Sequence, residues 1–173
     1  MLNVAQILDE GLLRLEHAQG KPAQVGFDLT LKQVNKVGSP SSGVIPKRIG
    51  KVLKDKTELT DYTPYSLINL DGDRGWLLYE GVYDITFNEG CKIPSNRVAF
   101  IKQRSSLYRN GTIINSPVFD PGFETEFMGT LMFVHETIFI EENARVAQIY
   151  FHECKAAELY TGQWQGDKQR AQQ

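Results

Sequence analysis

Hydrophobic and polar residues alternate along much of this chain, as they do in strands that bury one face. The segment QVGFDLTLKQV, residues 24–34, shows this alternation and predicts a half-buried strand. From Trp76 onward the pattern predicts further strands near residues 76–79, 82–87, 97–103, 112–115, 129–135, 137–141 and 145–153. Many short strands at regular spacing favour an all-β sandwich or jelly roll over a βαβ fold.

The N-terminal residues follow a different period. MLNVAQILDEGLLRLEH, residues 1–17, has apolar residues at helical spacing and predicts an amphipathic helix. Asp9, Glu10, Arg14 and Glu16 interrupt the apolar positions. We therefore expect neither a signal peptide nor a membrane span here.

Three segments lack a clear period. Residues 37–51 are rich in Gly, Ser and Pro and predict a loop, and residues 51–65 are polar and ambiguous. Residues 159–173 are polar and Gln-rich, which predicts a flexible C-terminal tail after a single domain at residues 1–158. Because the tail contains Tyr160 and Trp164, we expect it to dock on a partner surface.

Composition narrows the function classes. A chain of 173 residues suits one domain with a real core. Its formal net charge of −2 argues against a nucleic-acid binder held by positive charge. Any site for a polyanion must therefore be built locally.

Cysteine and histidine offer little metal or redox chemistry. Cys91 and Cys154 form no CxxC pattern, so we expect two buried thiols in a reducing, cytoplasmic compartment. His17, His135 and His152 lie far apart in the sequence, and none has a partner at metal-ligand spacing.

The segment IKQRSSLYRNG, residues 101–111, is the first candidate site. Arg104 is followed by Ser105 and Ser106 where a predicted strand ends, and Arg109 precedes an Asn-Gly turn. Arginine presents a planar fork of donors that matches phosphate oxygens, and each serine adds a hydroxyl. The three residues suit a phosphate, although a surface strand end with a serine turn has the same sequence.

Two aspartates are candidates for a different task. Asp120 precedes Pro-Gly in SPVFDPGFETEF, where it either caps its own turn or holds a water as a general base. Asp28, in VGFDL, lies in a predicted strand, either facing water or serving a site.

Four motifs in order resemble one superfamily. VGFDL, RSSL, VFDPGF and ARVAQIYF resemble motifs of the deoxyuridine triphosphatase and deoxycytidine triphosphate deaminase superfamily. The stretch LLYEGVYDITFNEGCKIPSNRVAFIKQRSSLYRNG and the tail LYTGQWQG are similar to the deaminase-like branch. The resemblance spans roughly residues 22–166 and implies a distorted β-barrel or jelly roll.

The resemblance implies a role for each matched residue. Arg104, Ser105, Ser106 and Gln148 would bind the triphosphate of a deoxynucleotide, dUTP or dCTP. Asp28 would help to hold Mg²⁺ through water while the metal bridges phosphate oxygens.

Further roles concern the nucleoside and the tail. Phe123 would crowd a 2′-hydroxyl and so select deoxynucleotides, and Asp120 would bind on the sugar side and position the attacking water. The family also implies a homotrimer with shared sites, in which the tail of a neighbouring subunit closes over the phosphates. The tail residues expected to take part are Gln163, Trp164, Gln165 and Lys168.

The two branches need different acid–base groups. Deaminases carry a Glu ten residues after the Asp of the DPG turn, with a nearby Ser and Arg, which Ser105 and Arg109 match. Here that count ends on Thr130, which is no general acid or base at neutral pH. Glu126 would serve only if this hairpin contains an insertion.

The sequence thus favours Mg²⁺-dependent hydrolysis of dUTP to dUMP and pyrophosphate. Two alternatives stay open: dCTP deamination, alone or combined with hydrolysis, and a non-catalytic member that binds or senses deoxynucleotides. An unrelated β-sandwich would bind no nucleotide.

Overall fold

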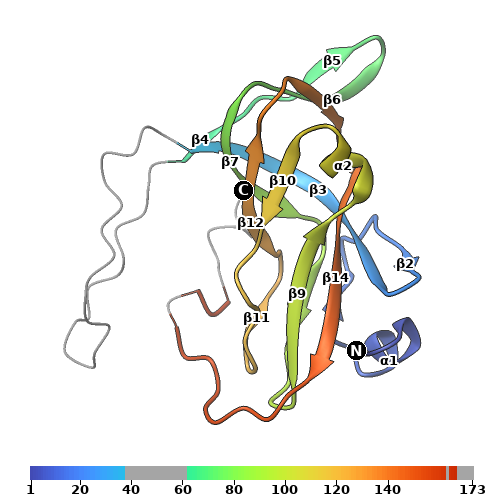
Figure 1. Cartoon of the computed structure of the whole chain (residues 1–173), viewed down its shortest axis with the longest axis vertical. Coiled ribbons are helices and arrows are strands. Elements are labelled where there is room, and N and C mark those ends of the chain that lie inside the picture. The colour runs from blue at the N-terminus through green and yellow to red at the C-terminus, as the bar shows by residue number, and fades with distance from the viewer. Residues whose placement is uncertain (38–61, 163, 167–173) are drawn as a thin grey trace, which may run out of the picture.

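The central feature is an antiparallel sheet curled into a nearly closed barrel (Figure 1). The computed structural model describes residues 1–37, 62–162 and 164–166. The two end strands of the sheet, β9 and β10, also lie against each other. The main path runs β10 (Thr112–Asn115), β12 (Gly129–Val134), β7 (Gly81–Phe87), β3 (Gly26–Val37), β14 (Arg145–Glu153) and β9 (Arg97–Gln103). Two short strands, β2 (Pro22–Ala23) and β4 (Tyr62–Pro64), also pair with β3.

Two small sheets complete the fold. One joins β1 (Leu13–Arg14), β8 (Gly90–Lys92) and β11 (Glu124–Thr125), and the other joins β13 (Ile138–Glu141), β6 (Asp73–Leu78) and β5 (Ile68–Leu70). Helix α2 (Ser105–Arg109) follows β9. The strands predicted at residues 97–103, 112–115 and 145–153 have the predicted bounds.

Alternating strands build the core. Along β7, Tyr83, Ile85 and Phe87 are fully buried inside the barrel, and Ile149 and Phe151 of β14 join the same hydrophobic cluster. Each large apolar side chain buried in this way contributes about 1.5–3 kcal/mol. Asp28 and Asp84 are buried as well, and a buried carboxylate must be compensated by hydrogen-bond or charged partners.

The N-terminal helix is shorter than the periodicity predicts. Helix α1 spans Val4–Asp9 and is closed at its start by a capping box between Asn3 and Gln6. Gly11 has φ +62, a backbone conformation that ends a helix. Leu13 then lies in β1 and pairs with Cys91 of β8. The helical prediction is therefore wrong beyond α1, because strand pairing and not a helix buries Leu13.

Other sequence predictions have mixed outcomes. The all-β fold is confirmed. The residues between Arg104 and the expected Asn-Gly turn form the short helix α2. Cys91 is buried but Cys154 is only partly buried. The predictions for residues 38–61 and for Gln163 and Lys168 lie outside the described residues. In the described part of the chain, no helix is long and apolar enough to cross a membrane.

Candidate active site

Arg104 occupies the junction between β9 and α2. Its backbone is extended, and its N–H donates to the Val146 carbonyl at 2.9 Å. This bond fixes Arg104 against β14, the strand that pairs with β3. The side chain therefore lies within reach of both strands.

Four side chains from two strands and this junction form what we call the arginine cluster: Asp28, Arg104, Arg145 and Gln148. The Asp28 Oδ2 accepts from Arg104 Nη1 at 2.6 Å and from Arg145 Nη1 at 2.9 Å. Its Oδ1 accepts from Gln148 Nε2 at 2.9 Å. The Asp28 side chain is only 2% exposed, and a buried carboxylate needs such partners to offset its lost hydration.

Strand register explains why these residues meet. Gln148 stands opposite Asp28 on β3 and opposite Lys102 on β9, so the three share one face of the sheet. With Arg104 and Arg145 this face carries three cations and one carboxylate. Arg145 and Lys102 are exposed on it.

The serines expected beside Arg104 lie in the first positions of α2. Ser105 and Ser106 are exposed, as is Arg109 in the last turn. Arg109 is thus one helix turn beyond the arginine cluster. The structure places all three near Arg104 in the chain, but records no side-chain contact between them and Asp28.

Asp28 does not fit the role of a direct magnesium ligand, and its expected role through water stays a prediction. Both of its oxygens accept hydrogen bonds, and two of these three bonds come from arginines. The carboxylate is also shielded from solvent. Mg²⁺ demands several oxygen ligands with little distortion. Among the described residues no group of three His, Cys, Asp or Glu side chains gathers to hold a metal.

A second group of residues lines a pocket of about 540 Å³, which we call the hairpin pocket. It is formed by the segment that links β10 to β12, by the middle of β7, by the first residues of β12, and by the C-terminal segment. The residues that line it are Asp84, Asn115, Ser116, Pro117, Val118, Phe119, Asp120, Phe123, Thr125, Phe127, Gly129, Thr130, Leu131, Tyr160 and Trp164.

The charge of the hairpin pocket is opposite to that of the arginine cluster. Asp84 and Asp120 are the charged side chains among its described lining residues. Asp120 is exposed, whereas Asp84 is 5% exposed and stands opposite Leu131 in the sheet. A pocket of aromatic rings and carboxylates suits a ligand group that donates hydrogen bonds. The same carboxylates would repel a phosphate.

Asp120 and Phe123 are held by a tight turn. The Phe123 N–H donates to the Asp120 carbonyl at 3.0 Å, and the Gly122 N–H donates to the Ile93 carbonyl at 2.8 Å. Gly122 has φ +87, and a Cβ there would approach Leu159 Cβ at 3.0 Å. Glycine is therefore needed both for the turn and for the approach of the C-terminal segment.

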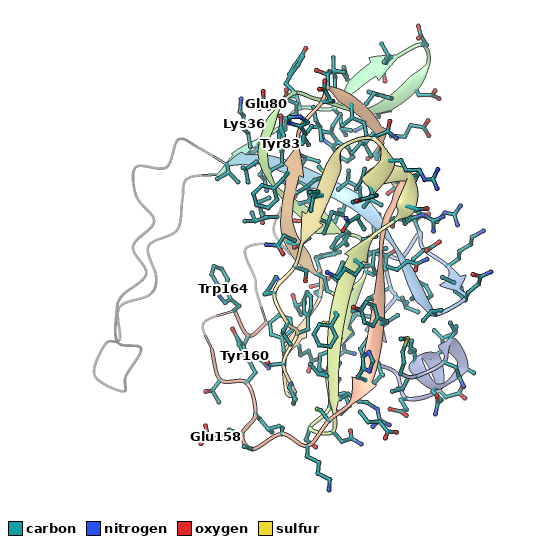
Figure 2. All side chains as sticks on the ribbon, in the orientation of Figure 1. Lys36, Glu80, Tyr83, Glu158, Tyr160 and Trp164 are labelled. Carbon is teal, nitrogen blue, oxygen red and sulfur yellow. The ribbon has the colours of Figure 1, made fainter. Side chains whose placement is uncertain are left out.

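The C-terminal segment docks on this turn (Figure 2). The Tyr160 N–H donates to the Pro121 carbonyl at 2.8 Å. Gln165 accepts from the Glu124 N–H and donates to the Gly122 carbonyl at 2.9 Å. The Tyr160 ring meets Phe123 edge to face, with centroids 5.3 Å apart. Burial, with Asp120 nearby, raises the pKa of Tyr160.

The remaining candidates for a deaminase shuttle have clear positions. Glu126 is exposed and faces His17 at 3.5 Å, and it does not line the hairpin pocket. Thr130 does line it, and its hydroxyl donates to the Asn115 carbonyl at 2.8 Å.

Sequence reasoning missed Asp84 and Arg145, although an acid inside an apolar strand and an Arg three residues before Gln148 were visible signals.

The two groups lie apart within one chain. None of the arginine cluster residues lines the hairpin pocket. In Figure 1, α2 lies at the upper end of β9, whereas β11 and the C-terminal segment lie toward its lower end. Asp120, Phe123 and Trp164 are thus brought together, and Arg104, Asp28 and Gln148 are brought together, but as separate groups.

Known proteins support the family resemblance. A family model described as dCTP deaminase-like matches residues 3–154. This chain belongs to the dCTP deaminase-like family. A Methanosarcina mazei protein named probable deoxyuridine 5′-triphosphate nucleotidohydrolase is 31% identical over 162 residues, which cover 88% of this chain and 87% of the relative. A Methanocaldococcus jannaschii protein named deoxyuridine 5′-triphosphate nucleotidohydrolase is 35% identical over 146 residues, 83% of this chain and 86% of that one.

A solved structure shares the fold. The crystal structure of the 2′-deoxycytidine 5′-triphosphate deaminase from Agrobacterium tumefaciens superposes with a TM-score of 0.56 at 16% identity. The match covers 87% of this chain but 46% of that one, so this chain spans less than half of the solved chain. The fold predicted from the sequence is confirmed.

Proposed function

We propose that this protein hydrolyses dUTP to dUMP and pyrophosphate. The observation that carries the proposal is the division between a cationic cluster and an acidic, aromatic pocket. A deoxynucleoside triphosphate has the same division, with charge at one end and an uncharged nucleoside at the other. The two curated relatives described above are both named for this activity.

The arginine cluster would bind the triphosphate. Arg104 and Gln148 are partly exposed to solvent, and both have side-chain N–H donors. Ser105 and Ser106 follow Arg104 directly in the chain and are exposed. Charge-assisted bonds from guanidinium groups to phosphate oxygens are among the strongest that proteins make. The hairpin pocket has no cation among its described lining residues and is left for the nucleoside.

Asp120 would position the water that attacks phosphorus. In this step a P–O bond forms to water, the bond between the α-phosphate and its bridging oxygen breaks, and pyrophosphate leaves. An exposed carboxylate at a fixed turn can accept the proton that the water loses. Phe123, held against Tyr160, would contact the sugar face and crowd a 2′-hydroxyl.

A homotrimer with shared sites is part of the proposal. The arginine cluster and the hairpin pocket lie apart in one chain, so one nucleotide would draw on different copies. Ile113 and Phe133 stand opposite each other on β10 and β12 and are 49% and 38% exposed, an apolar pair that suits contact with another copy. Mixing Arg104→Gln with Asp120→Asn subunits should restore part of the activity that each loses alone. No restoration in stable mixed trimers would contradict shared sites.

Magnesium and location complete the proposal. Because Asp28 is occupied by arginines, Mg²⁺ would be bound by the substrate's phosphate oxygens, whose charge it would offset. We propose a cytoplasmic protein, in keeping with a nucleotide substrate and unpaired cysteines.

A second candidate, deamination of dCTP, is favoured by the position of Asp84. This carboxylate lines the hairpin pocket one residue out of register with Thr130. In that reaction water adds to C4 of cytosine, ammonia leaves, and a carboxylate moves the proton from water to the leaving amine. Asp84→Asn should then abolish ammonia release, while Glu126→Gln should not.

One experiment separates the candidates. The protein is incubated with Mg²⁺ and each deoxynucleoside triphosphate in turn, and nucleotide, pyrophosphate and ammonia are measured. dUMP and pyrophosphate from dUTP, lost in Asp120→Asn, are the expected result. Ammonia from dCTP would establish the deaminase, and binding without turnover would indicate a non-catalytic member.

A further inference from the structure

Strand β11 has two residues, and its two side chains have different surroundings. The Thr125 side chain is buried and lines the hairpin pocket, as do Phe123 and Phe127 on either side of the strand. Glu124 does not line the pocket. Its carboxylate instead accepts a hydrogen bond from Arg14 Nη2 of β1. The strand between two pocket-lining rings is therefore tied to the N-terminal segment, by which we mean residues 10–17.

Strand register brings Arg14 and Glu124 to one face of the small sheet formed by β1, β8 and β11. Arg14 stands opposite Gly90 of β8. Glu124 stands opposite Lys92 of the same strand. Residues two apart in a strand point to the same face, so both pairs share it. The position opposite Arg14 has no side chain, which leaves room for the guanidinium to reach the outer strand.

The main chain of Glu124 holds the C-terminal segment. Its N–H donates to Gln165 Oε1 at 3.3 Å, and its carbonyl accepts from the Gly166 N–H at 2.8 Å. The same segment contributes Tyr160 and Trp164 to the lining of the hairpin pocket. Glu124 thus joins the N-terminal segment, one wall of the pocket and the C-terminal segment.

A second contact comes from the same N-terminal segment. The centroids of the His17 and Phe127 rings lie 5.2 Å apart, and His17 Nε2 lies 3.5 Å from the Glu126 carboxylate. Residues 14–17 therefore contact the chain on both sides of Thr125, the buried residue that faces the pocket.

We propose that Arg14 is a positioning residue for the hairpin pocket, and that it acts through Glu124 on the wall that meets the nucleoside. This inference rests on the proposed nucleotide substrate. Arg14 itself lies outside the lining of the pocket. Its loss should weaken binding of the nucleoside and loosen the C-terminal segment, while triphosphate binding at the arginine cluster stays unchanged.

The ion pair is better suited to orient β11 than to stabilise the fold. The side chains of Arg14 and Glu124 are 37% and 38% exposed, and ion pairs in such positions contribute little to stability. A strand of two residues has few backbone hydrogen bonds to resist displacement. A guanidinium that holds its carboxylate in one geometry therefore restricts how the strand can shift.

Three measurements on Arg14→Gln and Arg14→Lys test the inference. Calorimetric titration with dUMP reports mainly on the hairpin pocket, and titration with inorganic tripolyphosphate reports on the arginine cluster. Acrylamide quenching of Trp164 fluorescence, corrected with a Trp164→Phe blank, reports on the docked C-terminal segment without any nucleotide. Arg97→Gln is the matched control, because Arg97 pairs with Glu10 at 2.8 Å and ties the same N-terminal segment to β9, outside the pocket lining.

Arg14→Gln should weaken dUMP binding by roughly two- to fivefold, the scale of a partly exposed ion pair, and should increase quenching of Trp164. Tripolyphosphate affinity should stay at the parent value. Arg14→Lys should recover part of the loss, because lysine keeps the charge but lacks the planar fork. Arg97→Gln should lower the melting temperature and leave dUMP affinity as it is. Unchanged dUMP affinity in Arg14→Gln, or an equal loss in Arg97→Gln, would overturn the inference.

A double-mutant cycle decides whether Arg14 acts through Glu124. Glu124→Gln should reproduce the loss of dUMP affinity seen in Arg14→Gln, and adding Arg14→Gln to it should change little more. Additive losses in the double variant would show that Arg14 acts by another route and would refute the positioning role. Both side chains are partly exposed, so we expect all of these variants to fold.

The outcomes also separate this inference from the proposed function. Binding of dUMP and quenching of Trp164 that both depend on Arg14, in a protein that hydrolyses no dUTP, would sustain the inference and refute the function. Hydrolysis of dUTP with unchanged KM and unchanged dUMP affinity in Arg14→Gln would sustain the function and refute the inference.

Discussion

The arginine cluster lies on neighbouring strands of the central sheet, whereas the hairpin pocket is lined largely by turns, a two-residue strand and the C-terminal segment. In the cluster, strand register sets Gln148 opposite Asp28, and ion pairs to the buried Asp28 carboxylate hold the two arginines. In the pocket, a glycine turn and a docked segment place Asp120 and Phe123. The group expected to bind charge is therefore held by strand register and ion pairs, whereas the group expected to meet the nucleoside is held by a turn and a docked segment.

This difference predicts distinct failures. Changes in the cluster should weaken triphosphate binding without altering the pocket, and changes in the pocket should alter turnover or sugar selectivity. The tests that follow are ordered from the largest expected effect to the smallest.

Asp120→Asn should have the largest effect and confine it to turnover. Removing a group that positions or activates water costs about 10²–10⁴-fold in rate, so we expect kcat for dUTP to fall by that order while dUMP affinity changes little. The control is Asp71→Asn, because Asp71 is an exposed aspartate in the turn between β5 and β6. Equal activity of Asp120→Asn and the parent protein would remove Asp120 from the mechanism.

Arg104→Gln should weaken binding of the triphosphate. The loss of charge-assisted bonds corresponds to roughly 10–100-fold in affinity, measured with tripolyphosphate, while dUMP affinity stays near the parent value. Arg109→Gln offers a sharp comparison, because Arg109 is exposed in the last turn of α2. If both variants lose the same affinity, the cluster is not the specific triphosphate site.

Phe123→Ala should reduce selectivity for the sugar. The ring packs against Phe119 and Tyr160, with centroids 5.6 and 5.3 Å apart, and such pairs contribute about 0.5–1.5 kcal/mol beyond burial. We expect the ratio of kcat/KM for dUTP to that for UTP to fall about tenfold or less, on that scale. Phe139→Ala in β13 is the control for loss of a ring elsewhere. An unchanged ratio would mean that Phe123 does not read the sugar.

The sequence predicted the sheet better than the site. Strands such as Arg145–Glu153 were readable because one side of the barrel is buried, so every second residue must be apolar. The ion pair between Asp28 and Arg145 was not readable, since it depends on which strands become neighbours and joins residues 117 positions apart. Arg145 was missed for that reason, and Glu126 was considered although the bend after β11 brings it within 3.5 Å of His17.

The smallest effect concerns the C-terminal segment and pH. Burial of the hydroxyl, and the nearby Asp120, raise the pKa of Tyr160, so the folded state favours the neutral phenol. Its contribution to docking is therefore complete below the ordinary tyrosine pKa of about 10 and is lost as pH rises through the higher folded value. Fluorescence of Trp164, read against a Trp164→Phe blank, should report undocking above about pH 10. In Tyr160→Phe this transition should disappear, while Tyr108→Phe, which alters an exposed tyrosine, should keep it. A transition that persists in Tyr160→Phe would assign it to another group and leave the docked segment independent of the phenol.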